Sequence, residues 1–162
     1  MQFSVGVENA LHSVFYLVDL PPHKTIAIKE IARLNGIAET YLSKVFSKLR
    51  QAGIVRSVPG VSGGYELARS AEDISFWDVV EAIEGPSYLF RCAEIREQSI
   101  FADDAGAFSG SCPCLIKVVM QDAEEAMRND LRSKSLAWLH QTVRKDFSDE
   151  KKAAIAAWSR DA

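Results

Sequence analysis

The sequence predicts a mainly α-helical protein that carries one small β-hairpin. Apolar residues recur at helical spacing through most of the chain, and two of these periodic segments meet at Gly36. Two short apolar segments flank the Pro/Gly/Ser-rich residues 59–64 and are typical of paired strands. The chain has 162 residues, of which 48% are hydrophobic and 25% charged, as in ordinary globular proteins. This composition excludes a disordered chain, a collagen-like chain and a miniprotein held together by disulfides.

The first half of the chain contains three predicted helices, over residues 3–18, 28–34 and 39–51. The first ends before Pro21 and Pro22, which cannot continue a helix. The third carries a regular apolar stripe made of Leu42, Val45, Phe46 and Leu49. Because the second and third helices are joined by a turn that contains a glycine, the pair predicts a helix-turn-helix.

Residues 54–58 and 65–68 predict two strands, and the turn between them makes a β-hairpin wing. A short helix follows up to Ile83, with Ser75 as its N-cap. Gly85 and Pro86 then end the compact part of the chain.

Residues 87–111 show no regular pattern and predict a long loop, a kind of segment that is usually functional or disordered. The longest helix is predicted from Pro113 to Leu131, and two shorter helices at about Ser135–Lys145 and Ser148–Trp158. We therefore divide the chain into three parts. These are a winged helix-turn-helix at 1–86, a cysteine-containing loop at 87–112, and a long helix with C-terminal helices at 113–162.

The net charge of −3 argues against a protein that coats nucleic acid through bulk charge. The charge is unevenly distributed, however, because residues 1–72 carry eight Lys/Arg against six Asp/Glu, and residues 73–162 eleven against sixteen. Within residues 39–56, four cations stand against Glu39 alone. No apolar run approaches the roughly 18 residues that a membrane span needs, and the N-terminus lacks a signal-peptide pattern, so we expect a cytoplasmic protein with no membrane partner.

The third helix carries side chains that bind phosphates and base edges. If its apolar stripe points inward, hydroxyls and amines occupy the outward face, which fits the major groove. The candidate DNA-binding residues on this helix are Thr40, Tyr41, Ser43, Lys44, Ser47, Lys48 and Arg50. The alternative is an ordinary solvated face, but the position between a helix-turn and a wing favours DNA.

The wing tip has small residues that can approach the DNA backbone closely, and its candidate contacts are Gly60, Ser62 and Gly63. Arg56 and Arg69 flank the wing, and we expect the arginines to contact phosphates. A plain hairpin turn would also use these glycines, and surface arginines often serve only solubility.

Several segments together resemble one known family. Residues 41–55 read YLSKVFSKLRQAGIV, residues 60–67 read GVSGGYEL and residues 78–85 read DVVEAIEG. Over roughly residues 1–132 this chain resembles the Rrf-two family of bacterial winged-helix transcriptional regulators, which includes IscR and NsrR. The resemblance implies a homodimer in which the helix at 113–131 crosses over to the partner, and binding to a palindromic operator in double-stranded DNA. In many members an iron–sulfur cluster held by loop cysteines controls this binding, whereas other members lack the cluster cysteines.

The cysteines depart from the compact run of three that many cluster-bearing members have. Cys92 is followed only much later by Cys112 and Cys114, so other ligands are needed. Glu8 and His12 share one face of the first helix because they are four residues apart. A few relatives use Glu and His on that helix with two cysteines, which implies a [2Fe–2S] cluster held by Cys92 and Cys112 of one subunit and Glu8 and His12 of its partner. The alternative for Glu8 and His12 is an ordinary surface pair.

Cys114 has three interpretations. It is a further metal ligand, a reactive thiol whose pKa is lowered by the helix N-terminus, or a small buried hydrophobic residue. We rank Cys112 above Cys114 as a ligand.

The sequence thus favours a DNA-binding transcriptional regulator, a repressor, whose [2Fe–2S] cluster senses redox state or nitric oxide. The alternative is a cluster-free regulator that uses a switch between Cys92 and Cys112 or Cys114, or that responds to a ligand or a partner protein. An enzyme is not expected, because the chain has no nucleophile–base motif and no phosphate-binding glycine loop, and His23 and His140 lack ligand-spaced companions.

Overall fold

The computed structural model describes residues 2–60, 63–86, 88–98 and 114–161 of the chain. These residues form two compact units. The larger unit contains residues 2–85 and 131–161, and the smaller unit contains residues 86–130. In the described ranges, no helix is both long enough and apolar enough to cross a membrane.

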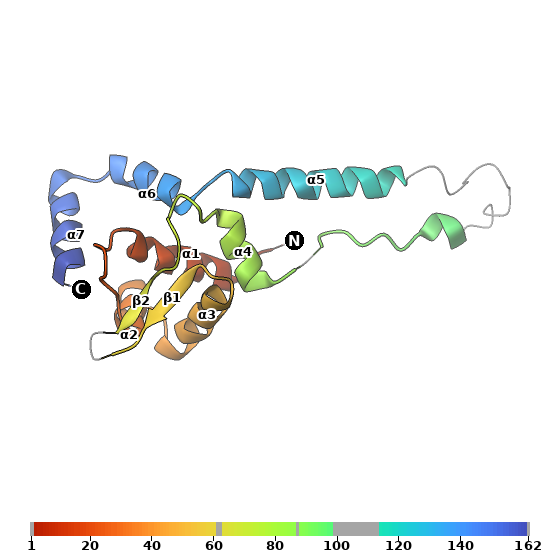
Figure 1. Ribbon diagram of the computed structural model, residues 1–162. Coiled ribbons are helices and arrows are strands. Elements are labelled where there is room, and N and C mark those ends of the chain that lie inside the picture. The colour runs from red at the N-terminus through yellow and green to blue at the C-terminus, as the bar shows by residue number, and fades with distance from the viewer. Residues whose placement is uncertain (1, 61–62, 87, 99–113, 162) are drawn as a thin grey trace. The chain divides into compact units, whose positions relative to one another are not determined.

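The larger unit is built around helix α1, whose buried face includes Val7, Ala10, Val14 and Leu17. Helix α1 contacts α2, α3 and α4, and also α6 (Leu136–Lys145) and strand β2 (Gly64–Leu67) (Figure 1). The bounds are Val5–Val18 for α1, Ile28–Asn35 for α2, Glu39–Gln51 for α3 and Phe76–Glu84 for α4. The four predicted helices of residues 1–86 are therefore confirmed, to within two residues at each end.

The turn between α2 and α3 depends on Gly36. Its φ of 66° lies in the left-handed region, and its amide donates to the carbonyls at the end of α2. Glycine adopts this conformation without the steric cost that a Cβ brings, so it ends one helix and lets α3 start at a new angle. On α3, Leu42, Val45, Phe46 and Leu49 are all buried, which confirms the predicted inward stripe.

Strands β1 (Val55–Val58) and β2 (Gly64–Leu67) pair antiparallel, with Val55 opposite Leu67 and Val58 opposite Gly64. A single β-bridge joins Ile26 to Tyr65, with backbone hydrogen bonds of 2.8 and 3.0 Å, and so extends the hairpin towards α2. The Tyr65 ring packs edge-on against Phe46 of α3 at 4.8 Å between centroids. The predicted wing is therefore present and is anchored to the core.

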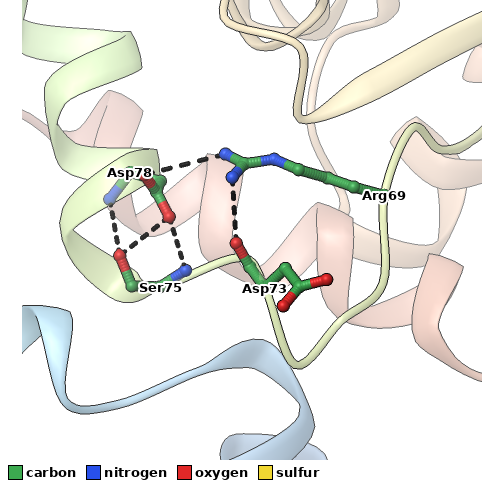
Figure 2. A network of polar contacts seen from close by, with 4 residues as sticks. All are labelled: Arg69, Asp73, Ser75 and Asp78. Carbon is green, nitrogen blue, oxygen red and sulfur yellow. Dashed lines mark hydrogen bonds and ion pairs between the residues drawn. The ribbon is translucent and has the colours of Figure 1, made fainter.

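Helix α4 begins with the predicted N-cap. The Ser75 side chain accepts from the Asp78 amide at 3.1 Å, and the Asp78 carboxylate accepts from the Ser75 amide at 2.7 Å. Arg69 reaches the same place, since its guanidinium donates to the Asp73 carbonyl at 2.9 Å and lies 3.7 Å from Asp78 (Figure 2). These bonds fix the turn that leads from the wing into α4.

Helices α6 (Leu136–Lys145) and α7 (Asp149–Asp161) belong to the larger unit. The Phe76 amide donates to Lys134 O at 2.8 Å and the Leu136 amide to Ile74 O at 2.9 Å, so the starts of α4 and α6 are joined. The sequence grouped residues 113–162 together. Packing instead divides them after residue 130, because Leu136 is fully buried in the core of the larger unit.

The smaller unit contains the 3₁₀ helix η1 (Ile95–Gln98) and most of α5 (Leu115–Arg132). The buried carboxylate of Glu124 on α5 accepts the Leu89 amide at 3.1 Å, and Lys117 lies 3.7 Å from Glu94. Residues 88–98, the described part of the predicted loop, therefore pack along α5. The remainder of that loop, together with Cys112, lies outside the described residues.

The wing contains a glycine that the fold requires. A Cβ on Gly64 would lie 2.4 Å from Ile26 O and 2.5 Å from Ile26 C, which are backbone atoms of the β-bridge. We predict that Gly64→Ala destabilises the protein by about 2 kcal/mol or more, measured by urea unfolding. A matched control is Gly36→Ala, whose Cβ meets nothing within 4 Å and which costs only the left-handed φ, about 1 kcal/mol. An equal or smaller loss for Gly64→Ala would contradict the steric argument.

Candidate DNA-binding face and sensor site

The outward side of α3 exposes the predicted polar residues. Thr40, Tyr41, Lys44, Lys48 and Arg50 are exposed, and Ser43 and Ser47 are half-buried. Ser43 bonds back to its own helix, because its hydroxyl donates to Glu39 O at 2.8 Å. Within the described part of the chain, the Lys44 and Arg50 side chains make no hydrogen bond or ion pair. The helix thus presents two cations that remain available to an anion.

Lys48 and Tyr41 contact their own domain, which the helical pattern could not show. The Lys48 ammonium donates to Ile83 O, the last turn of α4, at 2.6 Å. The Tyr41 hydroxyl lies 3.4 Å from the position that a Cβ on Gly6 would occupy. These two side chains lie at the edge of the outward face and touch α4 and α1.

In the described part of the wing, the backbone itself requires glycine at two positions. Gly60 has a φ of 125°, and a Cβ on Gly63 would lie 2.4 Å from Val58 O. Arg56 pairs across the strands with Glu66 at 2.9 Å. The hairpin therefore accounts for Gly60 and Gly63 without DNA, and the DNA contacts of the wing stay predictions. Ser62 lies outside the described residues.

Two of the three cysteines lie together in the smaller unit. The amides of Lys117 and Ile116, in the first turn of α5, hold the pKa of the Cys114 thiol below its usual range, aided by the charge of Arg96 and a hydrogen bond from Cys92. Burial opposes this shift. Both thiols are free and half-buried. The sequence ranked Cys112 above Cys114 as a ligand, and this ranking stays a prediction because Cys112 lies outside the described residues.

Glu8 and His12 are both exposed on α1, one turn apart. They lie at the wall of a cavity of about 510 Å³, which the sequence did not predict. The rest of the lining is mostly apolar and includes Phe3, Leu11, Phe15, Phe76, Leu139 and Val143. In the part of the chain that the structure describes, no three His, Cys, Asp or Glu residues are close enough to hold a metal ion.

His140 has a partner that sequence spacing could not reveal. Its Nε2 lies 2.8 Å from Asp19 Oδ1, and the Arg144 guanidinium donates to the same oxygen at 3.0 Å. The imidazole also packs on the Phe15 ring at 5.7 Å between centroids. This cluster fastens α6 to the end of α1, and its role is structural.

A helix-turn-helix followed by a wing, with cations on the exposed side of the third helix, defines a winged-helix DNA-binding regulator. The sequence profile of the Rrf2 family, described as "Iron-dependent Transcriptional regulator", matches residues 3–142. The chain therefore belongs to the Rrf2 family of transcriptional regulators, and it is not an enzyme.

Relatives of known sequence and structure agree with this assignment. Protein rrf2 of Nitratidesulfovibrio vulgaris is 34% identical over 128 residues, which cover 75% of this chain and 77% of that protein. The oxidized form of Staphylococcus aureus CymR is 27% identical, with a TM-score of 0.63 over 92% of this chain and 99% of that one. T. potens IscR is 24% identical, with a TM-score of 0.67 over 92% and 93% of the two chains, and shows the same fold.

The lowered pKa of Cys114 makes its reactivity testable. Because thiolate is the nucleophile, we predict that iodoacetamide alkylates Cys114 of metal-free protein with a pH midpoint below that of an ordinary thiol. Mass spectrometry of digested protein measures the rate, and Cys114→Ala assigns the labelled peptide. A midpoint at or above the ordinary thiol value would contradict the hydrogen bonding at the start of α5.

Proposed function

We propose that this Rrf2-family member is a homodimeric repressor that binds a palindromic operator through α3 and the wing, under the control of a [2Fe–2S] cluster. The observation that supports DNA binding is the exposed cationic face of α3, whose opposite face is buried in the core. As a DNA-binding regulator, the protein is proposed to act in the cytoplasm.

In this proposal, α3 enters the major groove. Thr40, Ser43 and Ser47 offer hydroxyls to base edges, and Lys44 and Arg50 pair with phosphates. Tyr41 and Lys48 lie at the edge of this face, and the wing residues Gly60, Ser62 and Gly63 approach the backbone with Arg56. Two such faces in a dimer match two half-sites of a palindrome.

The dimer is proposed to form through α5. Most of this helix is exposed in a single chain, including several apolar side chains. Leu115 is 72% exposed, Ile116 69% and Val119 64%. Such a stripe is costly in water and is typical of a protein interface. The partner surface is proposed to include the apolar cavity beside α1.

The donor set fits an iron–sulfur cluster in its chemistry. Cys92 and the thiolate-prone Cys114 supply soft sulfur ligands, and Glu8 and His12 supply an oxygen and a nitrogen on one helix face. We propose Cys92 and Cys112 of one subunit with Glu8 and His12 of the partner, and Cys114 as the alternative second sulfur. The cluster, when bound, supplies a one-electron centre that also reacts with nitric oxide.

Residues of the chain connect the state of the cluster to the affinity for DNA. Glu8 and His12 lie on the exposed face of α1, and the opposite face of α1 packs on α3 and α4. Binding or loss of the cluster at Glu8 and His12 therefore acts on α1, which packs against the DNA-reading helix α3. Imidazole binds metal in its neutral form.

A cluster-free thiol switch is the second candidate, and the pairing of Cys92 with Cys114 favours it. The Cys114 thiolate attacks a hydroperoxide, which gives a sulfenic acid and an alcohol. The Cys92 thiol then displaces water and forms a disulfide. Cys112 is not needed for this chemistry.

The DNA-reading role of α3 is tested through Lys44. We predict that Lys44→Ala weakens binding to operator and to unrelated duplex DNA alike, and lowers the slope of log affinity against log salt by about one. Fluorescence anisotropy over a salt series measures both. The control is Lys152→Ala on α7, which we expect to leave both quantities unchanged. Unchanged affinity for Lys44→Ala would remove α3 from the interface.

The ligand set is tested by variants of protein purified without oxygen. We predict about two iron and two sulfide per chain, and loss or shift of the visible spectrum in His12→Ala, Glu8→Ala and Cys92→Ala. Cys112→Ala and Cys114→Ala identify the second sulfur, with loss of colour expected for Cys112→Ala only. A normal spectrum in Cys92→Ala would refute the ligand set. Colourless wild-type protein that forms a Cys92–Cys114 disulfide with peroxide would establish the thiol switch instead.

A further inference from the structure

The N-terminus of α1 is held by a carboxylate from the end of α4. Glu84 Oε1 accepts the Ser4 amide at 2.9 Å and the Ser4 hydroxyl at 2.7 Å. Ser4 is the N-cap of α1, so an anion lies where the helix dipole favours one. The side chain of Ser4 does not cap its own helix, and Glu84 takes that place from eighty residues away.

Helix α3 also contacts the end of α4. Lys48 of α3 donates to Ile83 O at 2.6 Å, which places a cation at the C-terminal end of α4, again as the dipole favours. The two hydrogen bonds from Ser4, from its side chain and its amide, together with the Lys48 charge hold the pKa of the Glu84 carboxyl below its usual range. Glu84 is therefore ionised at neutral pH, and its charge links α1 and α3.

Gly6 permits this close approach. A Cβ at Gly6 would lie 3.1 Å from Ile83 Cγ2 and 3.4 Å from the Tyr41 hydroxyl. The first turn of α1 therefore touches α4 and the start of α3 together. Tyr41 and Lys48 are seven residues apart on α3, about 10 Å along its axis. Two contacts at that separation set the direction of the helix axis as well as its position.

We propose that Ser4, Glu84 and Lys48 form a junction that positions α3 for DNA reading and connects its orientation to the first turn of α1. Glu84 and Lys48 are positioning residues: Glu84 holds α1, and Lys48 holds α3, at the end of one shared helix. Glu8 lies one turn beyond Ser4, and Gly85, with a φ of 75°, ends α4 directly before the smaller unit begins. Movement of either α1 or the α4 end is thus transmitted to α3. This inference rests on the proposed DNA-reading role of α3.

The junction predicts a loss of specificity rather than a loss of fold. The Glu84 bonds are exposed to solvent, so the melting temperature should change little in Glu84→Ala, which removes both bonds and the charge. Glu84 carries negative charge and does not bind phosphate itself. Removing its charge would by simple electrostatics strengthen binding to any DNA, whereas a positioning role predicts weaker binding to the operator alone.

The experiment uses the full-length protein and an operator selected from random duplex DNA. For Glu84→Ala we expect operator affinity to fall about tenfold, with no fall in affinity for unrelated duplex and an unchanged salt slope. Lys44→Ala is the matched control, because loss of a phosphate contact lowers both affinities and the slope. Unchanged operator affinity in Glu84→Ala, or an equal change on both DNAs, would overturn the junction.

A double-mutant cycle gives an independent readout. If Glu84 and Lys48 act through one junction, Glu84→Ala combined with Lys48→Met should lose little more operator affinity than the larger single loss. Additive losses would contradict the coupling. Should Glu84→Ala fail to fold, Ser4→Ala removes only the hydroxyl bond and is compared in the same way. Wild-type protein that selects no duplex would overturn the proposed function, whereas normal wild-type binding with normal variants overturns the junction alone.

Discussion

Most elements of the larger unit pack against helix α1. Its buried face, centred on Ala10 and Val14, packs against α2, α3, α4, α6 and β2, so none of these elements keeps its place if α1 shifts. The exposed face of the same helix carries Glu8 and His12. A packed interior transmits such a shift because it has few voids that could absorb it. One helix therefore connects the candidate sensor residues to the helix that faces DNA.

Local physics made most of this fold predictable from the sequence. The stripe of Leu42, Val45, Phe46 and Leu49 determined both the extent of α3 and its buried side, and the serine N-cap fixed the start of α4. The alternation of apolar segments around a glycine-rich turn gave the wing. In each case the signal comes from neighbours within a few residues, where periodicity and backbone chemistry decide the outcome.

Contacts between distant residues could not be predicted in the same way. Lys48 was expected to face outward only, and its bond to Ile83 depends on where α4 ends in space. His140 meets Asp19 across 121 residues, and the packing of Leu136 moves α6 and α7 into the larger unit. The pairing of Cys92 with Cys114 likewise depends on how the chain returns along α5. Helical spacing cannot predict these contacts, because tertiary packing determines them.

Control of DNA binding by a cluster is best tested by comparing the operator affinity of one anaerobic preparation before and after its metal is removed with a chelator. We expect at least a tenfold difference between the two states, with the same melting behaviour of the larger unit. Equal affinity in both states, from protein shown to contain iron and sulfide at the start, would contradict control of DNA binding by a cluster.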